Sequence, residues 1–285
     1  MIKTYYLLTK PGIIIGNLIT TIAGFALASQ GHFQVPLFFA TMLGLGAVIA
    51  SACVFNNYID RDADEKMERT KNRPLVTKAI SNKSAILFAL FLGVVGIGIL
   101  ARYTNFLTVC VALVGFVVYV ALYSFWKYRT NLATLVGSIS GGVPLVVGYC
   151  AVSGRIDMGA LLLFAMIVLW QMPHFYSIAV YRMEEYAKAS IPVLPIAKGI
   201  YVTKVQMLLY IMAFIVSCIL LTIFGYTGYV YMGLAVPLGL SWLALCIHGF
   251  KGDNDKKWAR KMFSLSLFVI TSISVMISVD AFTRS

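Results

Sequence analysis

The chain has 285 residues, of which 60% are apolar and only 12% are charged. A soluble globular domain carries about 25% charged residues, so this composition excludes an ordinary soluble protein. The net charge of +12 does not indicate a nucleic-acid partner, because Lys and Arg are confined to short segments between long apolar stretches.

Nine apolar stretches follow one another along the chain. Each has about 18–22 residues, the length that crosses ~30 Å of hydrocarbon as an α-helix. Lipid offers the backbone no hydrogen-bond partners, so we predict helices. The predicted spans cover residues 12–29, 36–56, 84–101, 105–125, 132–152, 158–178, 203–224, 227–247 and 263–282. They use the whole chain, which predicts an all-α integral membrane protein with a single transmembrane domain over residues 1–285.

Positive charge is distributed unevenly between the two ends of these helices. If the N-terminus is cytoplasmic and all nine helices span, 20 Lys and Arg residues are cytoplasmic, and only Arg102, Arg155 and Arg284 lie on the other side. Such a bias sets the orientation of a membrane protein. We expect a cytoplasmic N-terminus, an extracytoplasmic C-terminus and contact with membrane lipids. No mitochondrial transit peptide precedes the first span, which favours a bacterial plasma membrane.

The second span runs into a polar segment. Asn56, Asp60 and Asp64 are spaced by four residues, so they share an arc of about 80° if the helix continues, while Asp62 points the opposite way. Carboxylate and carboxamide oxygens in this arrangement suit Mg²⁺, which completes its shell with water and substrate phosphate. An acidic helix end in solvent is the alternative. The polar residues begin within an apolar span, which favours a functional site.

A basic loop follows and reads RTKNRPL over residues 69–75. Pro74 favours an extended or turn geometry at Arg73. The guanidinium of Arg73 could hold a diphosphate through two parallel hydrogen bonds. Contact of the loop with anionic lipid head groups is the alternative.

Several segments together resemble a known family. The segment NNYIDRDAD at residues 56–64, followed by the basic loop, is similar to the first motif of the UbiA-type intramembrane prenyltransferases. The longer string resembles their heme O synthase branch, as do TKPG at 9–12, WQMPHF at 170–175 and IPVLP at 191–195. The resemblance covers essentially the whole chain. It implies a bundle of nine transmembrane helices around a central cavity open toward the cytoplasmic side.

The resemblance also implies roles for particular residues. Asn56, Asp60 and Asp64 correspond to the first motif that binds Mg²⁺ and a prenyl diphosphate, and Asp60 and Asp64 are candidate catalytic residues. Further contacts with the diphosphate are implied for Arg73 and, at the end of the fourth span, for Tyr123 and Lys127.

A second acidic motif is expected in the loop after the sixth span. The family usually has aspartates there, and its heme O synthase branch an Asp-Tyr pair, whereas this chain has Glu184 and Glu185 before Tyr186. Either glutamate is a candidate metal ligand, and Glu185 is a candidate catalytic residue that would hold a second ion. The neighbouring cations Arg182 and Lys188 are candidates for binding diphosphate.

His174 lies near the cytoplasmic end of the sixth span, about ten residues before the second acidic motif. A lone histidine in an apolar helix is commonly a packed, hydrogen-bonded residue. If heme is the acceptor, a neutral imidazole is its commonest protein ligand. We therefore expect His174 to contact heme, either at the iron or through a propionate.

The resemblance implies an Mg²⁺-dependent enzyme that transfers a farnesyl group from farnesyl diphosphate to a vinyl group of heme B, giving heme O and diphosphate. One alternative is a UbiA-type enzyme with another aromatic acceptor, such as hydroxybenzoate. A second is an ion-coupled transporter, although transporter sites tend to lie at broken helices near the midplane. Heme A synthase and a terminal oxidase are candidate partners, but no segment identifies such a contact.

Overall fold

The computed structural model describes residues 2–283, which form helices joined by turns and loops. In chain order the helical segments are α1 (Ile2–Leu8), α2 (Pro11–Ser29), α3 (Val35–Asp64), α4 (Asn82–Tyr103), α5 (Phe106–Val117), the π-helix η1 (Val118–Tyr123), α6 (Ser124–Trp126), α7 (Ala133–Ser153), α8 (Met158–Tyr181), α9 (Met183–Lys188), α10 (Leu194–Ile223), α11 (Tyr229–His248) and α12 (Asp255–Thr283).

Within residues 2–283, nine helices are long and apolar enough to cross a membrane, counting α5, η1 and α6 as one continuous helix. This confirms the predicted all-α integral membrane fold with nine spans. Arg284, which was counted among the extracytoplasmic charges, lies outside the described residues.

Three helices extend further than the apolar stretches predict. α3 continues to Asp64, α10 begins at Leu194 and α12 begins at Asp255. Charged residues such as Lys, Arg and Glu are good helix formers, so a helix need not end where its apolar residues end. In α10 the backbone leaves the helical region at Gly199, with φ of 85°, and the predicted span covers only the part beyond this kink.

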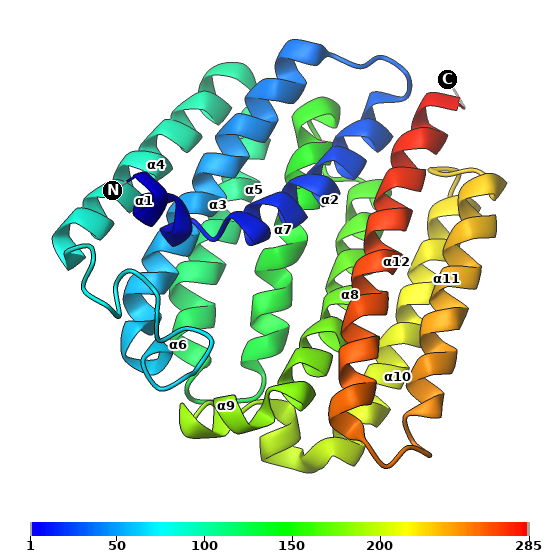
Figure 1. Cartoon of the computed structure of the whole chain (residues 1–285). Coiled ribbons are helices and arrows are strands. Elements are labelled where there is room, and N and C mark those ends of the chain that lie inside the picture. The colour runs from blue at the N-terminus through cyan, green and yellow to red at the C-terminus, as the bar shows by residue number, and fades with distance from the viewer. Residues whose placement is uncertain (1, 284–285) are drawn as a thin grey trace.

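The long helices pack into one bundle with α7 at its centre (Figure 1). α2 packs against α7, α3 against α4, and α8 against α7, α10 and α12. Leu145 of α7 belongs to the large hydrophobic core shared with α8, α10, α11 and α12, whereas Val143 and Val147 belong to a second core with α3, α4 and α5. α7 therefore joins the two halves of the bundle.

Two glycines allow α2 and α7 to approach closely. A Cβ atom on Gly24 would collide with the carbonyl oxygen of Leu145, and one on Gly148 would collide with that of Thr21. Small residues at such positions bring helix backbones into van der Waals contact, which is a main source of helix association in lipid. The close contact fixes the helices that form one wall of the interior.

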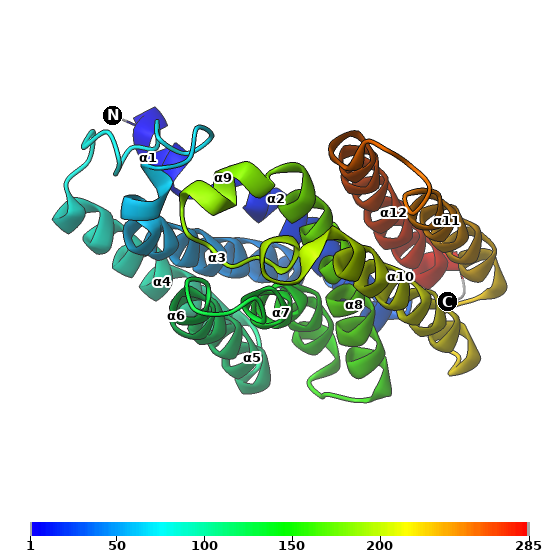
Figure 2. The same cartoon turned by 90° about the horizontal axis from the view of Figure 1, so that it is seen from below.

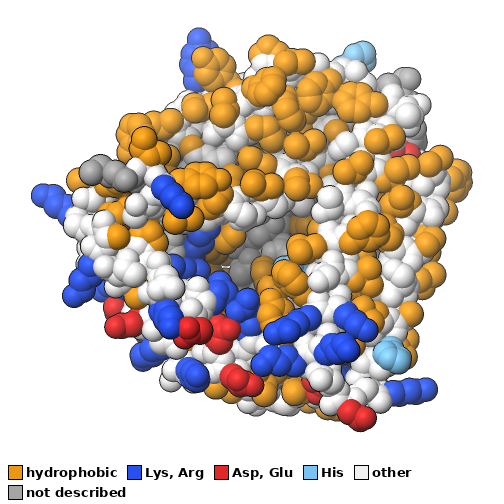
Figure 3. Space-filling model, viewed as in Figure 1, with side chains coloured by type: hydrophobic (Ala, Val, Ile, Leu, Met, Phe, Trp, Pro, Cys, Tyr) orange, Lys and Arg blue, Asp and Glu red, His pale blue; other side chains and the backbone are white. Residues whose placement is uncertain are grey.

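The charged loops gather at one end of the bundle. In Figure 1 this is the lower end, where α6, α9 and the loop between α11 and α12 lie, and Figure 2 shows that end directly, with α9 across it. Met67, which follows α3, packs with Ala189 and Ile191, which follow α9. This small apolar cluster joins the two loops. Figure 3 shows Lys and Arg side chains concentrated below and beside a hollow in the face of the molecule.

Candidate active site

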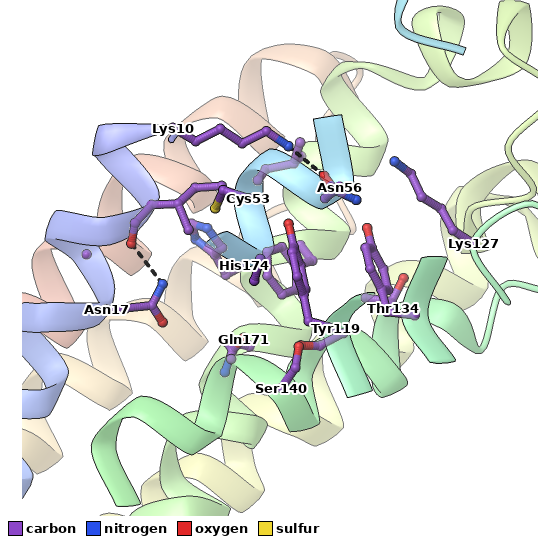
Figure 4. A pocket seen from close by; sticks show the side chains of 18 of the residues that line it. Lys10, Asn17, Cys53, Asn56, Tyr119, Lys127, Thr134, Ser140, Gln171 and His174 are labelled. Carbon is purple, nitrogen blue, oxygen red and sulfur yellow. Dashed lines mark hydrogen bonds between the residues drawn. The ribbon is translucent and has the colours of Figure 1, made fainter. Parts of the chain in front are cut away.

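A cavity of about 670 Å³ opens inside the bundle above the charged end. Residues from α2, α3, α5, η1, α7, α8 and α12 line it, together with the loops after α3 and α9. This volume is typical of small-molecule sites. Two groups of side chains, on its wall or in direct contact with the wall, differ sharply in chemistry, and Figure 4 labels Lys10, Asn56 and Lys127 of the first and His174 of the second. We call them the ionic cluster (Lys10, Asn56, Asp60, Asp64, Arg73 and Lys127) and the imidazole cluster (Trp170, His174, Phe263 and Ser266).

The ionic cluster is built on the last turns of α3. Asn56, Asp60 and Asp64 each line the cavity, and each has only 2% of its surface exposed. The side chain of Asp62 is 84% exposed. The helix continues to Asp64, so the spacing of four keeps the three polar groups on one face and turns Asp62 outward. The predicted arrangement of this segment is therefore present.

Each buried carboxylate of α3 meets a cation from another segment. Lys127 donates to Oδ2 of Asp60 at 2.6 Å, and the hydroxyl of Tyr128 donates to Oδ1 of the same residue at 2.7 Å. Arg73 donates to Oδ2 of Asp64 at 2.5 Å. Burial alone would lower the pKa of Lys127, but the neighbouring Tyr123 and Asp60 outweigh it and raise that pKa. Tyr128 lies beside the expected Lys127, but no local pattern of the sequence marks it as a partner of Asp60.

Lys10 is a further member of the ionic cluster, and its place in the TKPG segment at 9–12 predicts no role for its side chain. It lies between α1 and α2 with φ of 52°, lines the cavity, and donates to Oδ1 of Asn56 at 2.5 Å. Among the described residues it has no carboxylate partner within salt-bridge distance. Burial, followed by the nearby positive charge of Arg73, lowers the pKa of Lys10 to about 8. No local pattern indicates that this residue reaches α3, because the contact spans 46 positions of the sequence.

The wall beside the ionic cluster carries two tyrosines from the π-helical segment. Tyr119 and Tyr123 both line the cavity, and their rings stack at 5.6 Å with an interplanar angle of 11°. Lys127 lies 5.9 Å from the centre of the Tyr123 ring. The wider π-helix is a conformation that proteins often use at functional sites. Here it places a flat aromatic surface next to the cations.

The imidazole cluster lies deeper along α8. His174 precedes the end of α8 by two turns, or about 10 Å of helix rise. Its ring stacks on Trp170 at 4.7 Å and contacts Phe263 of α12 at 5.0 Å. Nδ1 lies 2.7 Å from the hydroxyl of Ser266, and the ring lines the cavity. Trp170 donates to the carbonyl of Ser266 at 2.9 Å, which fixes α8 against α12.

The second acidic motif does not share the cavity. The side chain of Glu184 is 83% exposed and lies 3.7 Å from Lys256, and Lys188 is exposed on the same side of α9. Glu185 accepts from Arg182 at 2.8 Å, and neither glutamate lines the cavity, whereas Arg182 does. In the short helix α9, positions two apart face opposite ways, so Tyr186 faces the cavity and Glu184 faces away. The structure thus does not bring this motif together with Asp60.

The α3 part of the ionic cluster has the donor set that Mg²⁺ prefers. The carboxylates of Asp60 and Asp64 and the carboxamide of Asn56 present hard oxygen atoms to one cavity. No group of three His, Cys, Asp or Glu residues in the described part of the chain could hold a metal alone. Mg²⁺ often binds through one or two carboxylates, with water and substrate phosphate completing its shell. The α3 residues fit that use, whereas Glu184 and Glu185 do not line the same cavity.

Comparison with known proteins decides the family. The model of the UbiA prenyltransferase family matches residues 17–269. The chain belongs to the UbiA prenyltransferase family. A relative named protoheme IX farnesyltransferase, from Protochlamydia amoebophila, is 55% identical over 280 residues, covering 98% of this chain and 99% of the relative.

Solved structures of other proteins have the same fold. One, described as giving structural and mechanistic insights into the biosynthesis of digeranylgeranylglyceryl phosphate synthase in membranes, has a TM-score of 0.83 at 19% identity and covers 99% of both chains. A UbiA homologue from Archaeoglobus fulgidus, bound to DMAPP and Mg²⁺, has a TM-score of 0.74 at 15% identity, covering 97% of this chain and 99% of that one.

Membership of the UbiA family confirms the resemblance expected from the sequence and the prediction of a membrane-embedded prenyltransferase enzyme. The ion-coupled transporter that the acidic residues left open is therefore excluded. At identities of 15–19% the structural matches bear on the fold only. The roles of individual residues rest on the geometry described above.

Proposed function

We propose that this enzyme transfers a farnesyl group from farnesyl diphosphate to a vinyl group of heme B, releasing diphosphate and giving heme O. The observation that carries the proposal is one cavity that combines the ionic cluster with the imidazole cluster. The first suits a diphosphate and its metal, and the second suits a flat, iron-containing acceptor. The relative named protoheme IX farnesyltransferase, at 55% identity, supports the same assignment.

The ionic cluster would bind the diphosphate head of the substrate. Asn56, Asp60 and Asp64 would hold Mg²⁺, which when bound acts as a Lewis acid on the departing diphosphate. The homologue solved with DMAPP and Mg²⁺ is an example of this fold with both a prenyl diphosphate and a metal bound. The amide Nδ2 of Asn56 is enclosed and has no hydrogen-bond partner among the described residues, so a phosphate oxygen would satisfy it.

The cations around the carboxylates would hold the diphosphate while negative charge develops on it. Lys127 and Arg73 are already aimed at the cavity by their ion pairs with Asp60 and Asp64. Lys10 has two N–H donors left after its bond to Asn56 and no carboxylate partner among the described residues, so a phosphate group would complete its bonding. Donors that are held in place before the reaction stabilise a leaving anion more than donors on a flexible loop do.

The apolar wall of the cavity would hold the farnesyl chain and the acceptor. As the C–O bond to diphosphate breaks, the face formed by Tyr119 and Tyr123 would stabilise the allylic cation. The vinyl group of heme then attacks the cation and forms the new C–C bond. Water adds to the resulting cation beside the pyrrole and loses a proton, which leaves a hydroxyethylfarnesyl side chain. His174 would hold heme through its iron.

The charged end of the bundle supports the proposed orientation in the membrane. The Lys and Arg residues concentrated there favour a cytoplasmic location for that end, and therefore a cytoplasmic N-terminus, in a bacterial plasma membrane (Figure 3). Farnesyl diphosphate would then reach the ionic cluster from the cytoplasm with its tail in the lipid. The apolar product would pass through the bilayer to a membrane-bound heme A synthase or terminal oxidase.

Mass spectrometry of hemes tests the proposal. The chain would be produced in a bacterial host that lacks its own heme O synthase, and the hemes would be extracted and separated. We expect a new heme whose mass exceeds that of heme B by one farnesyl group and one hydroxyl group. A farnesylated aromatic product without heme O would overturn heme as the acceptor while keeping the prenyltransferase assignment.

A further inference from the structure

We propose that Ser266 is a positioning residue, which holds His174 in the tautomer that leaves Nε2 free to bind the iron of the acceptor heme. This inference rests on the proposed function, and it concerns a residue of α12 for which the sequence gives no functional signal. Ser266 does not line the cavity, so it would act only through the imidazole ring.

The direction of the hydrogen bond between Ser266 and His174 follows from a count of protons. A serine hydroxyl has one proton to donate and lone pairs to accept. The Ser266 hydroxyl donates to the carbonyl of Phe263 at 2.6 Å, one turn earlier in α12. It must then accept at its 2.7 Å contact with Nδ1 of His174, so Nδ1 carries the ring proton.

The surroundings of His174 favour the neutral ring. An imidazolium would need a second acceptor at Nε2, and among the described residues Nε2 has no hydrogen-bond partner. No ion pair of the described residues includes His174, and the residue has only 8% of its surface exposed. A buried charge without a partner is costly, so the proton on Nδ1 is the only one.

The lone pair on Nε2 is therefore available, and the ring presents it to the cavity. Nε2 has no partner among the described residues, but the protein does not enclose it fully. His174 is part of the cavity wall. Trp170 and Phe263 hold the ring by stacking and tilted contact. A hydrogen bond at the far nitrogen is the usual means by which a protein orients a metal-binding imidazole and raises its basicity.

Removal of the Ser266 hydroxyl leaves the rest of the helix contact in place. Trp170 bonds to the backbone carbonyl of Ser266, not to its side chain, so Ser266→Ala keeps the link between α8 and α12. Ser266→Thr restores a hydroxyl on the same carbon. Ser274 gives a matched control, because it is buried on the same helix and its hydroxyl has no hydrogen-bond partner among the described residues.

Titration of the purified, detergent-solubilised protein with heme B would test the proposal by optical and electron paramagnetic resonance spectra. We expect Ser266→Ala to weaken heme binding about 10- to 100-fold and to change the signature of axial histidine ligation. Ser266→Thr should restore both, and Ser274→Ala should match the unaltered protein. Binding of farnesyl diphosphate should be the same in all three variants.

A parallel titration of His174→Ala separates failure of this inference from failure of its premise. If His174→Ala removes the ligation signature and Ser266→Ala retains it at normal affinity, the positioning role is wrong and heme ligation by His174 stands. If His174→Ala leaves the spectrum unchanged, His174 does not bind the iron, and both the ligand assignment and the inference fail. Loss of farnesyl diphosphate binding by Ser266→Thr as well as Ser266→Ala would indicate a general packing defect and would also overturn the proposal.

Discussion

In the ionic cluster, each carboxylate of α3 meets a cation from another segment, whereas the side chains that surround His174 carry no charge. Asp60 is bonded to Lys127 and Tyr128, and Asp64 to Arg73. His174 is held by aromatic rings and one hydroxyl. The two clusters face the same cavity, so the contrast shows how one site can receive a charged head group and an apolar acceptor.

The difference also predicts how the two clusters respond to substitution. Removal of one partner from a buried ion pair leaves the other charge uncompensated, which is costly. A neutral cluster loses only a contact or a hydrogen bond. Changes in the ionic cluster should therefore affect turnover most, and changes around His174 should affect heme binding more selectively.

The largest effect is expected from Asp60→Asn. The substitution keeps the size of the side chain, removes the negative charge of a proposed metal ligand and leaves Lys127 without its carboxylate. We expect turnover of farnesyl diphosphate to fall by about 10²–10³-fold or more, as for loss of a principal electrostatic group. Asp62→Asn is the control, since its side chain is exposed on the other face of α3. Equal rates for the two variants would contradict a role of the cavity-facing side of α3.

A smaller effect is expected from Lys10→Met, which keeps the apolar stem and removes the charge. A hydrogen bond to a charged group contributes about 1.5–3 kcal/mol, so the KM for farnesyl diphosphate should rise by about 10- to 100-fold. Heme titration should be unaffected. Lys10→Arg should recover part of the loss. Lys3→Met, at an exposed lysine of α1, is the control. A rise in the KM for heme instead would place Lys10 with the acceptor.

The smallest effects are expected in α9. Glu184→Gln should leave turnover within about twofold, because the side chain is exposed and its contact with Lys256 is a surface pair. Glu185→Gln weakens the pair with Arg182, which lines the cavity, and should lower turnover by a few-fold. Steady-state rates at saturating substrates would measure both. Loss of turnover in Glu184→Gln comparable to that in Asp60→Asn would show that the second acidic motif serves the reaction after all.

Much of the fold and part of the site could be predicted from local sequence. Nine apolar stretches predict nine spans because lipid forces the backbone into helices. The spacing of Asn56, Asp60 and Asp64 predicts a shared face because a helix repeats every 3.6 residues. These properties depend on residues close in the chain. The helical repeat did not predict where the side chains of Glu184 and Glu185 point, because the orientation of a short helix such as α9 depends on what it packs against.

The sequence by itself determined the class of protein, its spans and the polar face of α3, because local periodicity and hydrophobic length decide these features. Only the tertiary structure brought Lys10 to Asn56, Tyr128 to Asp60 and Ser266 to His174. These contacts join residues 46, 68 and 92 positions apart. Which residues form these contacts depends on how whole helices pack against one another. No short stretch of sequence specifies that packing.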